Sequence, residues 1–319
     1  MINFADHVFP QNSTIKQPDN SGLIKQESSL NVYSYSPILW SITQVLFIGW
    51  SLWEITYGNL NTIECAGLIL SIGVMAGAIG ITYSHELIHR KRIWERLAGE
   101  LLLISVTYHH WSVEHVHGHH RTVGTPDDPA TARLGESFFA FLPRTVIGGL
   151  ISSWKIETSR LQRRKRLTYG LSNRIISGII LQIVIYVLVI FVVGWEASIC
   201  LAVISFIAIF QLEIVNYFEH YGLQRVEISP GRYEPVKAMH SWDDGRKVSG
   251  YFLANLQRHA DHHLRPGIRY NDLKLIDGAP RLPAGYASML ILALIPPIWF
   301  SIMNPRVKLL YAKEASKYL

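Results

Sequence analysis

Four long stretches of the chain carry no charged residue, and they constrain the fold more than any other feature of the sequence. They cover residues 37–53, 65–83, 175–195 and 197–212. A helix needs about 20 residues, within a range of about 17 to 25, to cross the hydrocarbon layer of a membrane. With polar residues added at their flanks, the stretches predict four spanning helices over about 37–57, 64–84, 174–195 and 196–215. The composition agrees, because only 17% of the residues are charged, whereas soluble proteins average about 25%.

The distribution of Lys and Arg predicts how these helices are oriented. The short turns expected at 58–61 and 194–196 contain neither residue, whereas basic residues crowd 90–96 and 160–174. Cytoplasmic flanks of membrane helices carry the excess of Lys and Arg. We therefore expect a multi-pass protein with both termini and its middle in the cytoplasm. This topology explains the net charge of +6, and no nucleic-acid partner is expected.

Three weaker apolar stretches predict re-entrant or interfacial helices. They cover residues 101–111, 138–154 and 285–303. The last contains Pro296 and Pro297, which remove two backbone donors and break a helix. A spanning helix is the alternative there, because neighbouring helices can satisfy a broken backbone. The expected fold is thus an all-α polytopic membrane bundle, with one membrane domain over 37–307 between polar tails at 1–36 and 308–319.

Nine of the 14 histidines fall into four clusters next to the expected cytoplasmic ends of the helices. The clusters are His85 and His89; His115, His119 and His120; His220; and His259, His262 and His263. Residues at i and i+4 of a helix face the same way, so the pairs His85/His89 and His115/His119 are each expected to aim at one metal. These histidines predict a His-rich metal-binding cap on the membrane bundle.

The number of imidazoles favours two metal ions. Imidazole suits iron, copper, zinc and nickel, and a catalytic zinc takes about three protein ligands, so nine ligands exceed one zinc site. Four carboxylates adjoin the clusters, namely Glu86, Glu114, Glu219 and Asp261. Such neighbours commonly orient imidazoles by hydrogen bonding, and direct coordination by them is the alternative.

Two other hypotheses use fewer of these residues. The segment His85-Glu86-Leu87-Ile88-His89 also matches a zinc-peptidase motif in which Glu86 is the general base. That hypothesis leaves His119, His262 and the other imidazoles without a role. A metal-binding membrane scaffold without activity is the other hypothesis. The sequence shows no flavin, NAD or haem fingerprint and only two cysteines, so any redox reaction would need electrons from a separate carrier.

The motifs resemble those of the integral-membrane alkane 1-monooxygenases, within the wider group of membrane fatty acid desaturases and hydroxylases. The matching segments are His85–His89, Glu114–His120, Asn216–Leu223 and Leu256–His263, with similar residues at Thr125–Ala130 and Leu282–Tyr286. The pattern Asn-Tyr-x-Glu-His-Tyr-Gly separates this group from ordinary desaturases.

The resemblance implies two iron ions held by the nine clustered histidines. It also implies a bacterial cytoplasmic-membrane enzyme that uses O2 to hydroxylate the terminal methyl of an alkane arriving through the lipid. Electrons would come from rubredoxin, which in turn would receive them from a rubredoxin reductase. Hydroxylation of aromatic methyl groups, as in xylene monooxygenases, and hydroxylation or desaturation of fatty acyl chains remain as alternatives.

Overall fold

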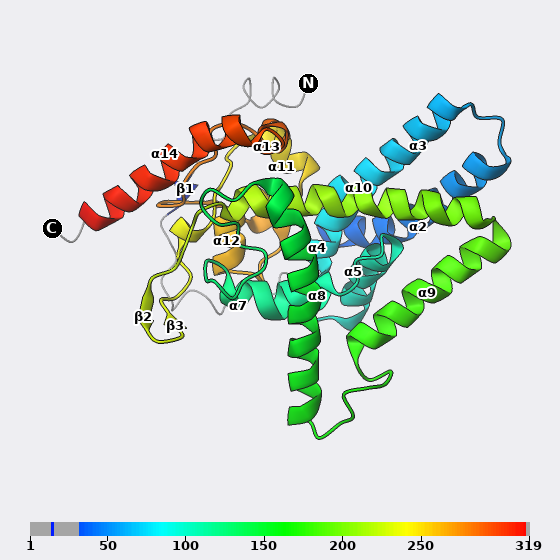
Figure 1. The fold of residues 1–319 in the computed structure, drawn as a ribbon, viewed down its shortest axis with the longest axis horizontal. Coiled ribbons are helices and arrows are strands. Elements are labelled where there is room, and N and C mark those ends of the chain that lie inside the picture. The colour runs from blue at the N-terminus through cyan, green and yellow to red at the C-terminus, as the bar shows by residue number, and fades with distance from the viewer. Residues whose placement is uncertain (1–13, 16–31, 317–319) are drawn as a thin grey trace. The chain divides into compact units, whose positions relative to one another are not determined.

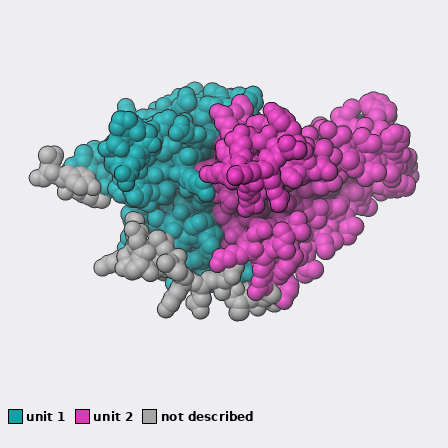
Figure 2. Space-filling model, turned by 90° about the horizontal axis from the view of Figure 1, so that it is seen from below, with its two compact units in different colours: residues 1–28, 119–147, 213–319 teal, residues 29–118, 148–212 magenta. Residues whose placement is uncertain are grey.

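The computed structural model describes residues 14–15 and 32–316, and their fold is almost entirely helical (Figure 1). Most of the expected polar tail at 1–36 lies outside these residues, as do residues 317–319. The chain divides into two compact units, coloured separately in Figure 2. Unit 1 comprises Met1–Ser28, His119–Ile147 and Glu213–Leu319, and unit 2 comprises Ser29–Gly118 and Gly148–Leu212.

Four helices are long and apolar enough to cross a membrane, which confirms the predicted number. They run over Tyr33–Tyr57, Thr62–Ile88, Arg174–Val192 and Trp195–His220. The first is α2 (Val32–Tyr57), and the second comprises α3 (Thr62–Met75), a π-helical segment η1 (Ala76–Ile81) and α4 (Thr82–Ile88). The last two are α9 (Arg174–Val192) and α10 (Trp195–His220), which a tight turn joins in Figure 1.

The turn between α2 and α3 is built by its sequence. The Asn61 side chain accepts hydrogen bonds from the backbone N–H groups of Ile63 and Glu64, and the Glu64 carboxylate accepts one from the Asn61 N–H. This reciprocal capping box satisfies donors that the first helical turn leaves open. It fixes the start of the second span without a charged loop.

Within unit 2 the spans pack through aliphatic side chains and leave their outer faces apolar. Ile48, Leu52, Ile72, Leu201 and Ile204 form a buried core between α2, α3 and α10. In contrast, α9 exposes its large aliphatic side chains, and only 11% of its most apolar stretch is buried. An exposed apolar helix face of this kind suits contact with lipid tails.

The π-helical segment η1 lies in the second span just before the first histidine motif, and its glycines admit two amide side chains. A Cβ atom at Gly80 would collide with the Gln44 carboxamide, and one at Gly77 would lie 2.6 Å from Gln211 Nε2. Gln44 also donates to Ser105 Oγ at 2.9 Å, and Gln211 donates to the Gly73 carbonyl at 3.2 Å. A larger residue at either position would have to displace the amide side chain that it faces, together with the hydrogen bond of that amide.

The remaining helices of unit 2 lead to the histidine motifs. They are α5 (Ile93–Ser105), α6 (Trp111–Glu114) and η2 (His115–His119), a π-helical turn that reaches the first residue of the next part of unit 1. The apolar stretch at 138–154 belongs to one longer helix, α8 (Phe138–Arg163), which begins in unit 1 and ends in unit 2. Pro143 lies in its second turn.

Unit 1 carries the short elements. They are β1 (Thr14–Ile15), α7 (His120–Thr122), β2 (Glu227–Ser229), β3 (Arg232–Tyr233), η3 (Ala238–His240), α11 (Lys247–Phe252), α12 (His259–Leu264), η4 (Tyr270–Asp272) and β4 (Leu275–Ile276). Strand β1 pairs in parallel with β4, and β2 pairs antiparallel with β3. Trp299 packs against Tyr217 and Tyr221, each at 5.2 Å between ring centroids, and anchors this unit's aromatic core.

The apolar stretch at 285–303 is broken at its proline pair. Helix α13 (Tyr286–Ala293) and helix α14 (Pro296–Ala315) meet at 119°. Proline lacks the N–H that would continue α13, and it is tolerated at the first turn of the new helix. The two helices together form either a broken span or a re-entrant loop, as the two prolines predicted.

Candidate metal centre

Four imidazoles converge inside unit 1. His119, His220, His259 and His263 each offer a nitrogen atom, and these atoms all lie within 4.8 Å of one another. The Nε2 atom of His259 lies 3.0 Å from Nε2 of His220 and 3.0 Å from Nε2 of His263. All four side chains are buried. His119 is the last residue of η2, His220 is the last residue of α10, and His259 and His263 belong to α12.

Hydrogen bonding alone does not account for this arrangement. An imidazole nitrogen either donates or accepts, so His259 Nε2 cannot pair with one neighbour as donor and with the other as acceptor. Two nitrogens bound at right angles to one metal, each at about 2.1 Å, would lie about 3.0 Å apart. The observed spacing of the Nε2 atoms matches that value. The donor set therefore fits a metal ion.

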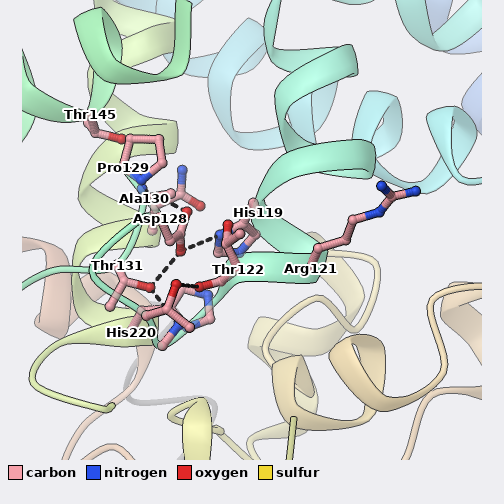
Figure 3. A network of polar contacts seen from close by, with 12 residues as sticks. His119, Arg121, Thr122, Asp128, Pro129, Ala130, Thr131, Thr145 and His220 are labelled. Carbon is pink, nitrogen blue, oxygen red and sulfur yellow. Dashed lines mark hydrogen bonds and ion pairs between the residues drawn. The ribbon is translucent and has the colours of Figure 1, made fainter. Parts of the chain in front are cut away.

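Asp128 fixes the His119 ring (Figure 3). Its Oδ2 lies 2.9 Å from His119 Nδ1 and accepts a hydrogen bond from Thr131 Oγ1 at 2.5 Å, while Oδ1 accepts one from the Ala130 N–H at 3.1 Å. Burial alone would raise the pKa of Asp128, but the His119 imidazole and the Thr131 hydroxyl hold it below its ordinary value. A carboxylate at Nδ1 leaves Nε2 of His119 with its lone pair directed away, as metal-binding histidines require.

Sequence reasoning missed this role of Asp128. The residue lies in the Thr125–Ala130 segment, which carried part of the family resemblance but received no function. The available signal was the pattern of two consecutive aspartates followed by proline, which is typical of a tight turn. Only the fold brings that turn to His119.

A short strap of backbone over His240–Asp244 connects the segments that carry the ligands. The His240 carbonyl lies 3.3 Å from His220 Nδ1 and can accept a hydrogen bond from an Nδ1–H group, which leaves Nε2 of His220 for a metal. The Trp242 N–H donates to the Glu219 carbonyl at 2.8 Å, and the Asp244 N–H donates to the Gln257 carbonyl at 2.9 Å. The strap thus joins the end of α10 to the residues that directly precede α12.

Asp243 is the side chain by which this strap holds α12. Its Oδ1 accepts a hydrogen bond from the Ala260 N–H at 2.7 Å, directly after His259, and its Oδ2 pairs with Arg281 Nη1 at 3.1 Å. Burial raises the pKa of Asp243 to about 7 against the opposing effect of these donors. The carboxylate caps the first turn of α12, as acceptors at helix starts do.

The other five predicted ligands belong to different units, with His85, His89 and His115 in unit 2 and His120 and His262 in unit 1. In unit 2, the ring centroids of His85 and His115 lie 4.5 Å apart, and those of His89 lie 5.2 Å from each of them. Trp111 stacks on His115 at 4.3 Å. In unit 1, His120 Nε2 and His262 Nε2 lie 3.0 Å apart.

The pairing of His115 with His119 differs from expectation. The i, i+4 spacing predicted that both rings face the same way, yet His115 lies beside His85 and His89, whereas His119 lies beside His220 and His263. The physical reason is the π-helical turn over His115–His119, which changes the angle between successive residues from that of an α-helix.

The four carboxylates expected to orient imidazoles have different surroundings. Glu219 accepts a hydrogen bond from Tyr286 Oη at 2.5 Å, and its other oxygen lies 3.4 Å from His259 Nε2. Glu86 pairs with Arg90 at 2.9 Å, and Asp261 pairs with Arg265 at 2.5 Å. Glu114 is buried, with Oε1 2.8 Å from where a Cβ of Gly118 would lie.

The electrostatics of the pocket favour uncharged imidazoles. Burial lowers the pKa of His263 well below its usual range, and the neighbouring imidazoles of His259, His120, His119 and His220 act in the same direction. A neutral imidazole is the form that binds a metal. His263 therefore presents a lone pair rather than a positive charge at neutral pH.

Comparison with known proteins places the chain in a family. Residues 62–292 match the family model described as fatty acid desaturase. The chain is 38% identical to alkane 1-monooxygenase 2 of Pseudomonas aeruginosa over 303 residues, which are 94% of this chain and 80% of that protein. It is 41% identical to alkane 1-monooxygenase 2 of Alcanivorax borkumensis over 81% of this chain and 67% of that protein.

The name of a more distant relative indicates a different class of compound. The hydroxylase component of a xylene/toluene monooxygenase from Pseudomonas putida is 28% identical over 77% of this chain and 65% of that protein. The metal-binding histidine clusters, the spanning helices and these relatives agree with one another. The chain is therefore a multi-pass membrane oxidoreductase that belongs to the alkane 1-monooxygenase family, within the fatty acid desaturase group.

Proposed function

We propose that the chain is a di-iron monooxygenase that converts alkanes into 1-alkanols in the membrane. The observation that carries the proposal is the buried four-imidazole cluster of His119, His220, His259 and His263 in a relative of alkane 1-monooxygenases. The reaction balances as alkane, O2, two electrons and two protons giving alkanol and water. When bound, a pair of irons supplies the redox chemistry that activates O2.

The number and kind of donor support two ions. The four-imidazole cluster would hold one iron, and five predicted ligands remain for a second ion, namely His85, His89, His115, His120 and His262. Either set alone meets the needs of one ion, and nine imidazoles exceed what one catalytic zinc takes. Imidazole also suits iron.

The residues around the cluster have roles that do not depend on the metal being present. Asp128 keeps a proton at Nδ1 of His119, and the His240 carbonyl does so at Nδ1 of His220. Tyr286 donates to Glu219 and holds this carboxylate beside His259. Burial of all these groups excludes bulk water, which strengthens each interaction.

An alkane suits the fold because it has no polar group to recognise. Selection must rest on apolar contact, which gains about 0.8 kcal/mol for each buried methylene. The apolar helices of unit 2 give such a molecule access from the lipid. The names of the relatives at 36–41% identity favour alkanes over aromatic methyl groups, the class named for the relative at 28%. Fatty acyl chains remain a further alternative substrate.

Electrons must reach the site from another protein, and we propose rubredoxin, reduced by a rubredoxin reductase. Histidine side chains can bind metals but are not redox carriers, and the sequence lacks a flavin, NAD or haem fingerprint. We further propose that the chain lies in the bacterial cytoplasmic membrane with both termini in the cytoplasm, because Lys and Arg concentrate on that side of the predicted topology.

A substrate panel tests the proposal. The purified full-length protein, with rubredoxin, its reductase and NADH, is given octane, xylene or laurate under 18O2, and the products are separated by chromatography. We expect 1-octanol carrying one 18O atom as the main product. The His220→Ala variant should insert into membranes normally but form no labelled product. Labelled methylbenzyl alcohol from xylene, with no octanol, would reject the alkane assignment.

A further inference from the structure

The loop between α8 and α9 exposes both cations and large apolar side chains. Arg163, Arg164, Lys165 and Arg166 follow one another and are exposed, and no carboxylate of the described chain pairs with them. Directly after them, the side chains of Leu167, Tyr169 and Leu171 are 83%, 75% and 73% exposed. Three large apolar side chains in five residues are seldom left in water when the segment is ordered.

The end of α8 keeps a cation where glycine would be easier. The Lys165 N–H donates to the Gln162 carbonyl at 2.9 Å, and the Arg166 N–H donates to the Leu161 carbonyl at 3.0 Å. This is the Schellman pattern, in which the residue after the helix takes a left-handed conformation and is usually glycine. Lys165 has φ of +53°, which is unfavourable for a residue with a Cβ. Backbone strain of this kind suggests that the side chain has a function.

A buried carboxylate holds the loop in place. The Glu157 side chain is fully buried and pairs with Arg160 at 2.5 Å and with Arg174 at 2.9 Å. Arg160 Nη2 donates to the Ser172 carbonyl at 3.1 Å. These contacts tie the last turns of α8 to the first residue of α9, so the loop is anchored at both ends.

A second set of contacts shapes the middle of the loop. The Asn173 side chain caps α9 by accepting from the Ile175 N–H at 2.9 Å, and it donates to the Thr168 carbonyl at 2.9 Å. Tyr169 packs on Trp154 with 5.8 Å between ring centroids. Tyr and Trp are enriched where membrane helices meet the headgroup layer. The loop is therefore preformed and presents an aromatic pair at the start of a spanning helix.

We propose that the loop over Arg163–Leu171 is a binding site for anionic phospholipid headgroups of the surrounding bilayer. The four cations would contact phosphate groups, while Leu167, Tyr169 and Leu171 would enter the boundary between headgroups and acyl chains. The position of the loop selects lipid as the partner, because α9 begins at Arg174 and is itself a spanning helix. Basic residues beside a membrane helix are attracted to anionic lipid, and amphipathic surface segments bury their apolar side chains there.

The test uses the full-length protein in nanodiscs of phosphatidylcholine alone or with added phosphatidylglycerol. Amide hydrogen exchange is measured across residues 164–173, and the relative association of spin-labelled phosphatidylglycerol is measured by electron paramagnetic resonance. We expect slower exchange in the loop when the anionic lipid is present. The R164Q/K165Q/R166Q variant should lower the preference for phosphatidylglycerol by at least about fivefold, the effect of one basic residue near an anionic surface.

Two further variants separate a site from a general charge effect. R306Q/K308Q/K313Q removes three exposed cations from α14 and should leave the lipid preference and the exchange of the loop unchanged. L167S/Y169S/L171S should restore fast exchange of the loop while keeping the protein folded. Equal losses of lipid preference in the α14 and loop charge variants would overturn the proposal. Protection of the loop only after an acidic electron-carrier protein is added would also overturn it and indicate a protein-docking surface.

Discussion

Replacing Asp128 by asparagine should weaken iron binding by about 10- to 100-fold, the usual cost of changing a carboxylate behind a metal-binding histidine. Asp128 Oδ2 accepts from both His119 Nδ1 and the Thr131 hydroxyl. An asparagine oxygen in the place of Oδ2 can still accept both bonds, but it is uncharged, and the amide NH2 group cannot accept from the Ala130 N–H. A hydrogen bond to a charged group contributes about 1.5–3 kcal/mol and a neutral one about 1 kcal/mol.

The difference between the charged and the neutral hydrogen bond, about 0.5–2 kcal/mol, corresponds to roughly 2- to 30-fold in an equilibrium constant. The imidazole of His119 also becomes less basic without the carboxylate, which moves the expected loss of iron affinity toward 100-fold. Asp128→Ala should cost more, because it leaves the buried Nδ1–H of His119 without its acceptor. The conservative variant is therefore the informative one, since its side chain keeps the volume of the turn.

The assay is a competition titration of iron against a soluble chelator for the wild type, D128N and D127N. Asp127 is exposed and precedes Asp128 in the same turn, so D127N controls for loss of a negative charge. Circular dichroism confirms that each variant is folded. Iron affinity of D128N within twofold of the wild type, or an equal loss in D127N, would refute the role of Asp128.

Three further predictions concern other parts of the chain. Burial would raise the pKa of Glu157, but its two arginine partners lower it to about 2. Because this pKa lies below the value near 4.5 of the unfolded chain, the carboxylate stabilises the fold above pH 4.5. This contribution is lost as the pH falls toward 2. The free energy of unfolding of the Glu157→Gln variant should thus be lower by up to about 3 kcal/mol at pH 7. A lower unfolding temperature would show this loss, and an unchanged temperature would contradict this role of Glu157. Asp243→Ala should reduce bound iron more than Asp243→Asn, whose oxygen can still accept from the Ala260 N–H, and equal iron contents would exclude this cap as the cause. Gly80→Ala should lower the unfolding temperature by displacing Gln44, with partial recovery in the double variant Gly80→Ala/Gln44→Ala; additive losses would show that the two residues act independently.

The apolar stretches predicted the spanning helices because a membrane helix needs only length and absence of charge. The turn at 58–61 followed from the same pattern. The second turn lies at 193–194 rather than at 194–196, because α10 already begins at Trp195. The end of α8 at Arg163 could not be predicted, because it depends on the contacts of Glu157 with Arg160 and Arg174 rather than on hydrophobicity. The start of α2 at Val32, five residues before Pro37, was likewise absent from the pattern of charges.

The histidine motifs predicted which imidazoles lie close together in the candidate metal centre but not how they are grouped. Spacing rules assume an α-helix, and the π-helical turn at His115–His119 departs from it. Asp128 and Asp243 act across 9 and 17 residues of sequence, on His119 and Ala260 respectively. Such long-range contacts depend on the fold, so no local pattern specifies them.

Metal analysis of the purified full-length chain tests the central claim most directly. The nine clustered histidines predict two iron ions per chain, and His220→Ala should reduce this number while the helical content stays unchanged. One zinc ion per chain without iron would contradict the account and favour the peptidase hypothesis built on His85, Glu86 and His89.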